Sequence, residues 1–163
     1  MDDFCVMILT IGIPGSGKST WVKDYCEKHK NGTFVISTDE IRKELTGNEQ
    51  CIDPSQNSMI HDEAKKRAKK IIDNRKEIMK KLGTWPVIII DSTNVEINEW
   101  IDYRQLGANI LAAKLFDVTP EQAQERMKNR ERKVPYEIIK WKWELLEKNK
   151  QHISKLFNML IYF

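Results

Sequence analysis

The sequence predicts an α/β fold of three layers, in which a mainly parallel sheet of about five strands lies between two layers of helices. Short apolar runs alternate along the chain with segments of helical character. Two of these runs, residues 5–11 and 85–91, are apolar almost throughout, as in strands buried on both faces. Right-handed crossovers then bring the carboxyl ends of the strands to one edge, where such sheets bind ligands.

The first third of the chain predicts two pairs of a strand and a helix. Residues 19–29 have a helical pattern, and a turn at residues 31–32 precedes a second strand at residues 33–37. Ser37 and Glu40 have the spacing of a helix capping box, so we expect a helix to start there.

The middle of the chain predicts a polar loop at residues 45–53 and one long helix at residues 54–82, which Gly83 ends. The polar face of that helix is crowded with lysines and arginines, and it is either a solvated surface or a basic wall along the path of a polyanion. The remaining elements are helices at residues 96–106, 119–129 and 135–155 and strands at residues 85–91, 109–116 and 158–163.

Length and composition bound the function classes. Residues 1–163 fit one domain, and a composition of 40% hydrophobic and 31% charged residues is that of a soluble globular protein. The three cysteines are odd in number and lack metal-site spacing, which argues against a disulfide framework or a zinc site. No apolar run approaches the ~20 residues that span a bilayer, so we expect no membrane partner and a place in the cytoplasm of a bacterial or phage-infected cell.

Residues 12–19, GIPGSGKS, fit the phosphate-binding loop pattern G-x-x-x-x-G-K-[ST] at every fixed position. Its glycines allow successive N–H groups to turn inward around phosphate oxygens. Lys18 is placed to reach the β- and γ-phosphates, and the Ser19 hydroxyl to ligate Mg²⁺. The sequence therefore predicts ATP or another nucleoside triphosphate with Mg²⁺. The alternative, a glycine-rich turn without a ligand, fits less well with the strand before the loop and the helix after it.

Two carboxylates are expected at the same edge of the sheet. Asp39 lies three residues before Arg42, so the carboxylate can take a hydroxyl proton while the guanidinium holds a phosphate. The alternative is a helix-capping aspartate with a surface salt bridge. Asp91 ends an apolar strand and needs a partner or a metal, unless it only caps the turn that follows.

Arg126 and Arg130 lie one helical turn apart before a charged loop. They would close over the nucleotide as a lid, at about residues 119–136, and neutralise transition-state charge. The alternative is a solvated basic face that also includes Lys128, Arg132 and Lys133.

Four stretches in order, residues 9–21, 37–42, 90–94 and 126–135, resemble the phage-type polynucleotide 5′-kinases. The resemblance implies a P-loop kinase domain with a helical lid, in which Asp39 is the general base and Arg42 contacts acceptor phosphates. Lys18 and the lid arginine Arg130 would complete the catalytic set, although the lid is one residue shorter than the family pattern, which leaves Arg132 as a rival. The implied nucleotide contacts are Gly12, Gly15, Ser16, Gly17, Lys18, Ser19, Thr20, Arg126 and Arg130, and the implied acceptor contacts are Asp39, Arg42, Asp91, Thr93 and Asn94.

The resemblance predicts transfer of the γ-phosphate of ATP to the 5′-OH end of single-stranded RNA or DNA. The phage enzymes also carry a 3′-phosphatase domain of the D-x-D-x-T type, and this chain has no such motif. An end-healing role would then need a separate ligase or phosphatase partner. A kinase of small alcohols, such as nucleosides, sugars, antibiotics or toxin targets, is the alternative, and a nucleotide-binding module without transfer activity stays open.

Overall fold

A computed structural model of the chain describes residues 2–48 and 54–162. It has the predicted α/β fold, with a five-stranded sheet in the order β2-β3-β1-β4-β5 and every neighbouring pair parallel. The strands are β1 (Val6–Ile11), β2 (Thr33–Ser37), β3 (Val87–Asp91), β4 (Ile110–Leu115) and β5 (Met159–Leu160). The helices are α1 (Lys18–Lys28), α2 (Thr38–Thr46), α3 (Pro54–Asp73), α4 (Arg75–Leu82), α5 (Ile97–Gln105), α6 (Pro120–Met127), α7 (Tyr136–Asn149) and α8 (Ile153–Leu156), with a 3₁₀ turn, η1 (Lys150–His152), between the last two.

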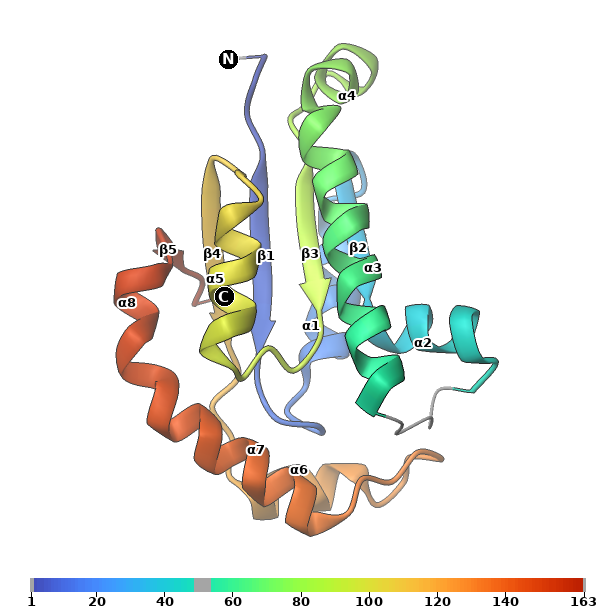
Figure 1. The fold of residues 1–163 in the computed structure, drawn as a ribbon, viewed down its shortest axis with the longest axis vertical. Coiled ribbons are helices and arrows are strands. Elements are labelled where there is room, and N and C mark those ends of the chain that lie inside the picture. Colours follow the sequence, from blue (N-terminus) through green and yellow to red (C-terminus); the bar gives the residue numbers. More distant parts are fainter. Residues whose placement is uncertain (1, 49–53, 163) are drawn as a thin grey trace.

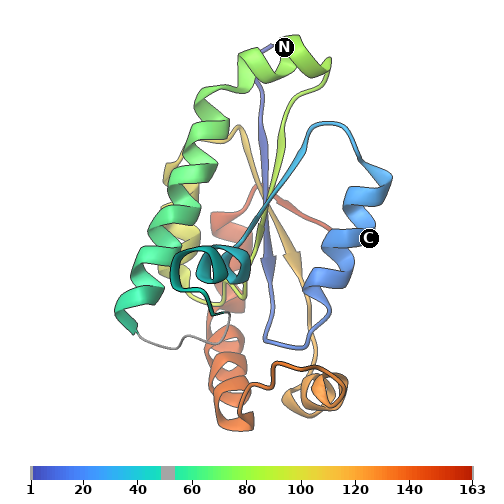
Figure 2. The same ribbon diagram turned by 90° about the vertical axis from the view of Figure 1, so that its right-hand side faces the viewer.

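Helices cover both faces of the sheet (Figures 1 and 2). α1 lies on one face, where its Val22 packs on Ile8 and Ile89 of the central strands. α3 and α5 lie on the other face, above a larger apolar core that also takes side chains from α7 and α8. The α6 and α7 pair lies beneath the carboxyl ends of the strands, at the edge where the phosphate-binding loop follows β1 (Figure 1).

The predicted long helix at residues 54–82 is wrong in one respect, because it is two helices that meet at Asn74. The Asn74 side chain donates a hydrogen bond to the Lys70 carbonyl at 2.7 Å, and the residue has a ψ angle of 10°. An asparagine that bonds the backbone of the preceding turn competes with regular helix, and α4 starts directly after it.

The predicted helix at residues 135–155 is also divided. α7 ends at Asn149, whose side chain is buried and donates to the Val95 carbonyl at 2.9 Å. The chain then tightens into η1 before α8, and the expected last strand contributes only Met159 and Leu160 to the sheet.

Two expectations concern residues only partly described. Helix α2 runs to Thr46 and ends at Gly47, so the predicted loop at residues 45–53 starts later, and residues 49–53 lie outside the described residues. Cys5 and Cys26 are free thiols, and Cys51 also lies outside the described part of the chain. Among the described helices, none is long and apolar enough to cross a membrane.

Candidate active site

The loop at residues 12–17 makes a tight turn between β1 and α1. Gly15 and Gly17 have φ angles of 82° and 98°, which residues other than glycine rarely adopt. The Ser16 N–H donates to the Ile13 carbonyl at 3.2 Å. A Cβ atom on Gly15 would lie 2.6 Å from the Ala123 carbonyl oxygen of α6. Gly15 therefore allows both the turn and the close approach of the lid helix.

Lys18 lies folded over this loop. Its ammonium donates to the Ile13 carbonyl at 2.8 Å and to the Ser16 hydroxyl at 3.4 Å. Burial lowers the pKa of the Lys18 ammonium to about 8, and the carboxylates of Asp91 and Asp39 offset part of that decrease. A poorly solvated cation beside inward-turned backbone N–H groups fits the phosphates of a nucleotide.

Ser19 and Asp91 bring oxygen atoms together beside the loop. The Ser19 hydroxyl donates to Asp91 Oδ2 at 3.3 Å. Burial raises the pKa of the Asp91 carboxyl, and the Lys18 ammonium opposes that rise. Hydroxyl and carboxylate oxygens suit Mg²⁺, which usually keeps several waters and substrate phosphates as its other ligands. The described residues contain no cluster of three or more His, Cys, Asp or Glu that could hold a metal by itself.

Asp39 lies between two guanidinium groups. Its Oδ1 atom accepts from Arg42 at 2.5 Å and from Arg132 at 2.8 Å. Arg42 is only 9% exposed and also donates to the Asn57 side chain of α3 at 3.3 Å. The predicted pair of Asp39 and Arg42 on one helical face is present. Arg132 adds a contact from the lid to the same carboxylate.

The two rival lid arginines lie in different surroundings. Arg132 contacts Asp39, as above. Arg130 is close enough to Lys18 to lower the pKa of that ammonium further. The structure thus brings Arg132 to Asp39 and Arg130 within electrostatic range of Lys18 in the phosphate loop.

Arg126 docks α6 onto the phosphate loop, because its guanidinium donates to the Ser16 carbonyl at 3.1 Å. Gly12 is buried, and its N–H donates to the Thr93 carbonyl at 3.0 Å. Thr20 is exposed on α1. All three therefore lie in or beside the loop, as their prediction as nucleotide contacts requires.

Asn94 lies beneath the site rather than at its surface. It is fully buried with a φ angle of 47°, and its side-chain amide donates to the Thr10 carbonyl at 2.8 Å. It thereby joins the loop after β3 to β1. A direct contact of its amide group with an acceptor would require the bond to Thr10 to break. Thr93, in contrast, is half-buried, and its hydroxyl accepts from Lys142 of α7 at 3.2 Å.

Lys142, His61 and Glu99 are polar residues near the acceptor side that the sequence reasoning missed. His61 Nε2 lies 3.7 Å from Glu99 Oε1, and Lys142 is close enough to influence the pKa of both groups. The signal for Lys142 is its spacing from Ile139 and Leu146, which places it on the buried stripe of α7. His61 follows the buried Ile60, and Glu99 precedes the buried Trp100. Neither has a helical spacing that would have indicated a place in the site.

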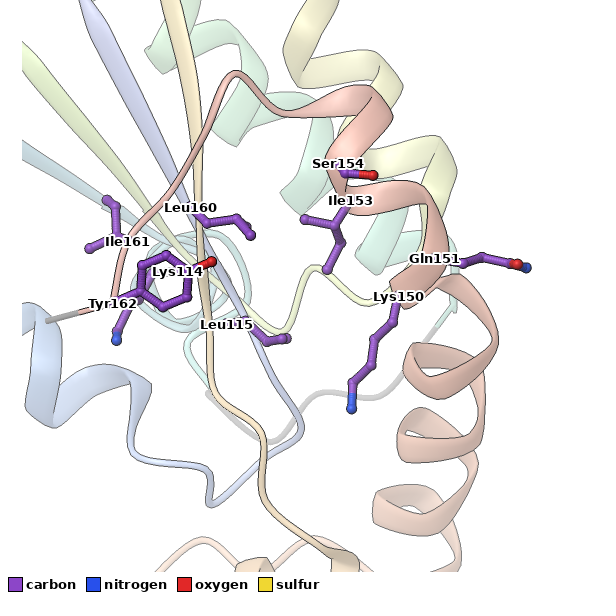
Figure 3. Close-up of a pocket in the computed structure, with 9 residues that line it drawn as sticks. All are labelled: Lys114, Leu115, Lys150, Gln151, Ile153, Ser154, Leu160, Ile161 and Tyr162. Carbon is purple, nitrogen blue, oxygen red and sulfur yellow. The ribbon is translucent and has the colours of Figure 1, made fainter.

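A cavity of about 480 Å³ lies between β4 and the α8 region (Figure 3). It contains none of the predicted site residues. The Lys114 side chain there lies over the Phe116 ring, and Lys150 is paired with Asp117 and Glu147. The residues that line the cavity are Lys114, Leu115, Lys150, Gln151, Ile153, Ser154, Leu160, Ile161 and Tyr162.

Comparisons with known proteins agree with this geometry. A family model described as an AAA domain matches residues 7–149. Among solved structures, a chain of the Pnkp1/Rnl/Hen1 RNA repair complex matches with a TM-score of 0.72 at 19% identity, over 91% of this chain and 46% of that chain. A chain in another structure of the Pnkp1/Rnl/Hen1 complex gives 0.61 at 21% identity, over 82% and 44%. The present chain therefore spans less than half the length of both.

A gluconokinase from Sinorhizobium meliloti 1021 matches with a TM-score of 0.58 at 17% identity, over 94% of this chain and 79% of that chain. At such identities the likeness establishes the fold, which is that of P-loop kinases, and leaves the acceptor open.

Proposed function

The chain belongs to the AAA domain family and has a P-loop kinase fold, and from this premise we propose that it is an ATP-dependent polynucleotide 5′-hydroxyl kinase. The observation that supports this most is the position of Asp39 between Arg42 and Arg132. A carboxylate in reach of an alcohol can take its proton, and two guanidinium groups beside it suit an acceptor that carries phosphate. A neutral sugar or nucleoside would bring no negative charge to these two guanidinium groups, whereas an acceptor phosphate would.

The residues divide into a donor side and an acceptor side. When bound, Mg²⁺ would neutralise charge on the phosphates, held through Ser19 and Asp91. Lys18 and Arg130 hold the β- and γ-phosphates on the donor side. On the acceptor side, Asp39 takes the proton of the 5′-hydroxyl. The oxygen of that hydroxyl bonds to the γ-phosphorus, and the bond from that phosphorus to the ADP oxygen breaks.

A kinase of a small alcohol is the second candidate. The match to the gluconokinase supports it, because that match covers more of both chains than the matches to the repair complexes. The two candidates differ in their response to salt. Binding of a polynucleotide weakens as salt rises, because the release of its condensed counterions becomes less favourable. Binding of a small alcohol that carries at most one charge, such as a nucleoside or gluconate, changes much less.

The deciding experiment is transfer of labelled γ-phosphate from ATP to a 5′-OH oligonucleotide, with nucleosides and gluconate as competing acceptors. Asp39→Asn keeps the size of the side chain and removes its ability to take a proton. We expect the transfer rate to fall on the order of 10²- to 10⁴-fold with ATP binding retained, as for loss of a general base. Glu40→Gln, at the exposed neighbouring position, is the matched control.

Each other outcome has its own meaning. Label on a small alcohol alone would transfer the proposal to the second candidate. Binding of ATP without any transfer would favour a nucleotide-binding module. Full activity of Asp39→Asn would contradict the role of Asp39. If polynucleotide transfer is found, a separate ligase or phosphatase partner becomes part of the proposal.

A further inference from the structure

Lys142 is a half-buried cation directed at the acceptor side of the site. It lies on α7 between Ile139 and Leu146, which are buried, so its position belongs to the packed stripe of that helix. Its ammonium donates to the Thr93 hydroxyl at 3.2 Å. Thr93 lies two residues beyond Asp91, where the sheet ends. A lysine of α7 therefore reaches the edge of the sheet that carries the phosphate loop.

This ammonium has no counter-ion among residues 2–48 and 54–162, where no carboxylate lies within ion-pair distance of it. Lys65 on α3, which is also only partly exposed, is different, since it pairs with Asp62 and Asp102. An ammonium has three donors, and the bond to Thr93 uses one of them. A partly desolvated cation with two unused donors is costly unless it meets an anion.

The charged neighbours of Lys142 have both signs. Burial lowers the pKa of its ammonium, the carboxylates of Glu99 and Glu96 oppose this decrease, and the guanidinium groups of Arg42 and Arg132 add to it. Burial raises the pKa of the Glu99 carboxyl to about 7, so only part of its charge is present at neutral pH. The Nε atom of Arg42 is buried without a hydrogen-bond partner among the described residues. Arg42, which contacts Asp39, and Lys142 are thus two neighbouring cations that each have a donor without a partner among the described residues.

We propose that Lys142 binds, together with Arg42, the acceptor phosphate next to the hydroxyl that Asp39 deprotonates. This inference rests on the proposed polynucleotide kinase function and adds an acceptor-binding residue to it. Lys142 turns from the Thr93 hydroxyl toward the phosphate, or keeps that bond and uses its remaining donors. Lys142 is also close enough to Lys18 to lower the pKa of that ammonium.

A purely structural role is the competing explanation. The Thr93 carbonyl accepts from the Gly12 N–H, so Lys142 could act only by holding Thr93 and with it the start of the phosphate loop. The two roles differ in one respect. A structural lysine matters for every ligand, whereas a phosphate-binding lysine matters only when the phosphate carries its charge.

The test uses fluorescence anisotropy with two labelled 5′-OH oligothymidylates, one with a native first linkage and one with a neutral methylphosphonate there. We expect Lys142→Met to weaken binding of the native probe about tenfold or more, as for loss of a hydrogen bond to a charged group. The loss on the methylphosphonate probe should be much smaller. Lys142→Arg keeps the charge and should restore most of the binding, and Lys140→Met, exposed on the same helix, should bind both probes like the wild type.

An equal loss on both probes, or no loss on either, would overturn the inference and leave the proposed function intact. A wild-type protein that binds neither probe would contradict the proposed function itself. Should Lys142→Met fail to fold, Lys142→Gln takes its place in the same comparison, and equal affinity of the wild-type protein for the native and neutral linkages would by itself overturn the inference.

Discussion

The carboxyl group of Glu99 gives the fold a pH dependence that can be worked out from its surroundings. Its side chain on α5 is 20% exposed, and its Oε2 atom accepts from the Glu96 N–H at 3.3 Å. Burial raises its pKa from 4.5 to about 7. The folded protein therefore holds this proton more tightly than the unfolded chain does. Its stabilising contribution is complete below the unfolded pKa and is lost as the pH rises through the folded one.

The size of the effect follows from the shift. A difference of about 2.5 pKa units corresponds to roughly 3 kcal/mol of unfolding free energy, at about 1.4 kcal/mol per unit. Glu99→Gln keeps an acceptor for the Glu96 N–H and removes the charge. We expect the variant to match the wild type near the unfolded pKa of 4.5. Well above the folded pKa it should be more stable than the wild type by about 3 kcal/mol.

The groups that face Glu99 are His61 on α3, Lys142 on α7, and two residues of its own helix segment, Glu96 at the N-cap of α5 and Asp102 within it. Burial lowers the pKa of the His61 imidazole, so His61 contributes stability in the opposite direction, gained as the pH rises. Because His61 is present in both proteins, the effect of its burial cancels, and the difference between them reports Glu99 together with its interaction with His61.

The measurement is urea unfolding, followed by tryptophan fluorescence, of both proteins across this pH range. Glu144→Gln, at an exposed position of α7, is the matched control and should show no pH-dependent difference from the wild type. The reasoning would be refuted if the difference in unfolding free energy between Glu99→Gln and the wild type stayed constant with pH. It would also be refuted if the variant became less stable than the wild type above the folded pKa.

Two further predictions concern the lid and the loop. Arg132→Met should raise the KM for the polynucleotide about tenfold, because it removes a charged contact on the acceptor side, whereas Arg130→Met should act on the KM for ATP. Steady-state kinetics with each substrate varied in turn gives the two KM values separately. A variant that changes the KM for ATP and the KM for the polynucleotide equally would contradict the assignment of Arg130 to the donor and Arg132 to the acceptor. Gly15→Ala should lower stability by about 3 kcal/mol through its positive φ and the 2.6 Å approach to Ala123. An unchanged Tm would show that the turn can relax.

The sequence predicted the strand and helix order well because its signals are local. The apolar runs at residues 5–11 and 85–91 became the central strands β1 and β3, as their continuous hydrophobicity indicated. The helix breaks at Asn74 and Asn149 were missed for different reasons. The Asn74 side chain bonds the Lys70 carbonyl of the preceding turn, a local competition that the apolar spacing does not reveal. The Asn149 side chain bonds the carbonyl of Val95, which is remote in sequence.

In the site, too, the contacts that were missed join residues remote in sequence. Spacing could place Asp39 and Arg42 on one helical face, because residues three positions apart are neighbours on the surface of a helix. It could not place Arg132 on that carboxylate, since this contact joins residues 93 positions apart. Nor could it distinguish Asn94 from Thr93, which are adjacent in sequence, although one is buried beneath the site and the other is half-buried at its edge.

Thr93 shows why the missed contacts matter for function. Its carbonyl holds the Gly12 N–H at the start of the phosphate loop, and its hydroxyl holds Lys142 of α7. Arg126 of α6 bonds the other end of the same loop at Ser16. The α6 and α7 pair is therefore anchored to the phosphate loop directly through Arg126 and indirectly through Thr93. A change in the position of this pair has to alter both connections, so the arginines that it carries and the loop that holds the nucleotide are positioned together.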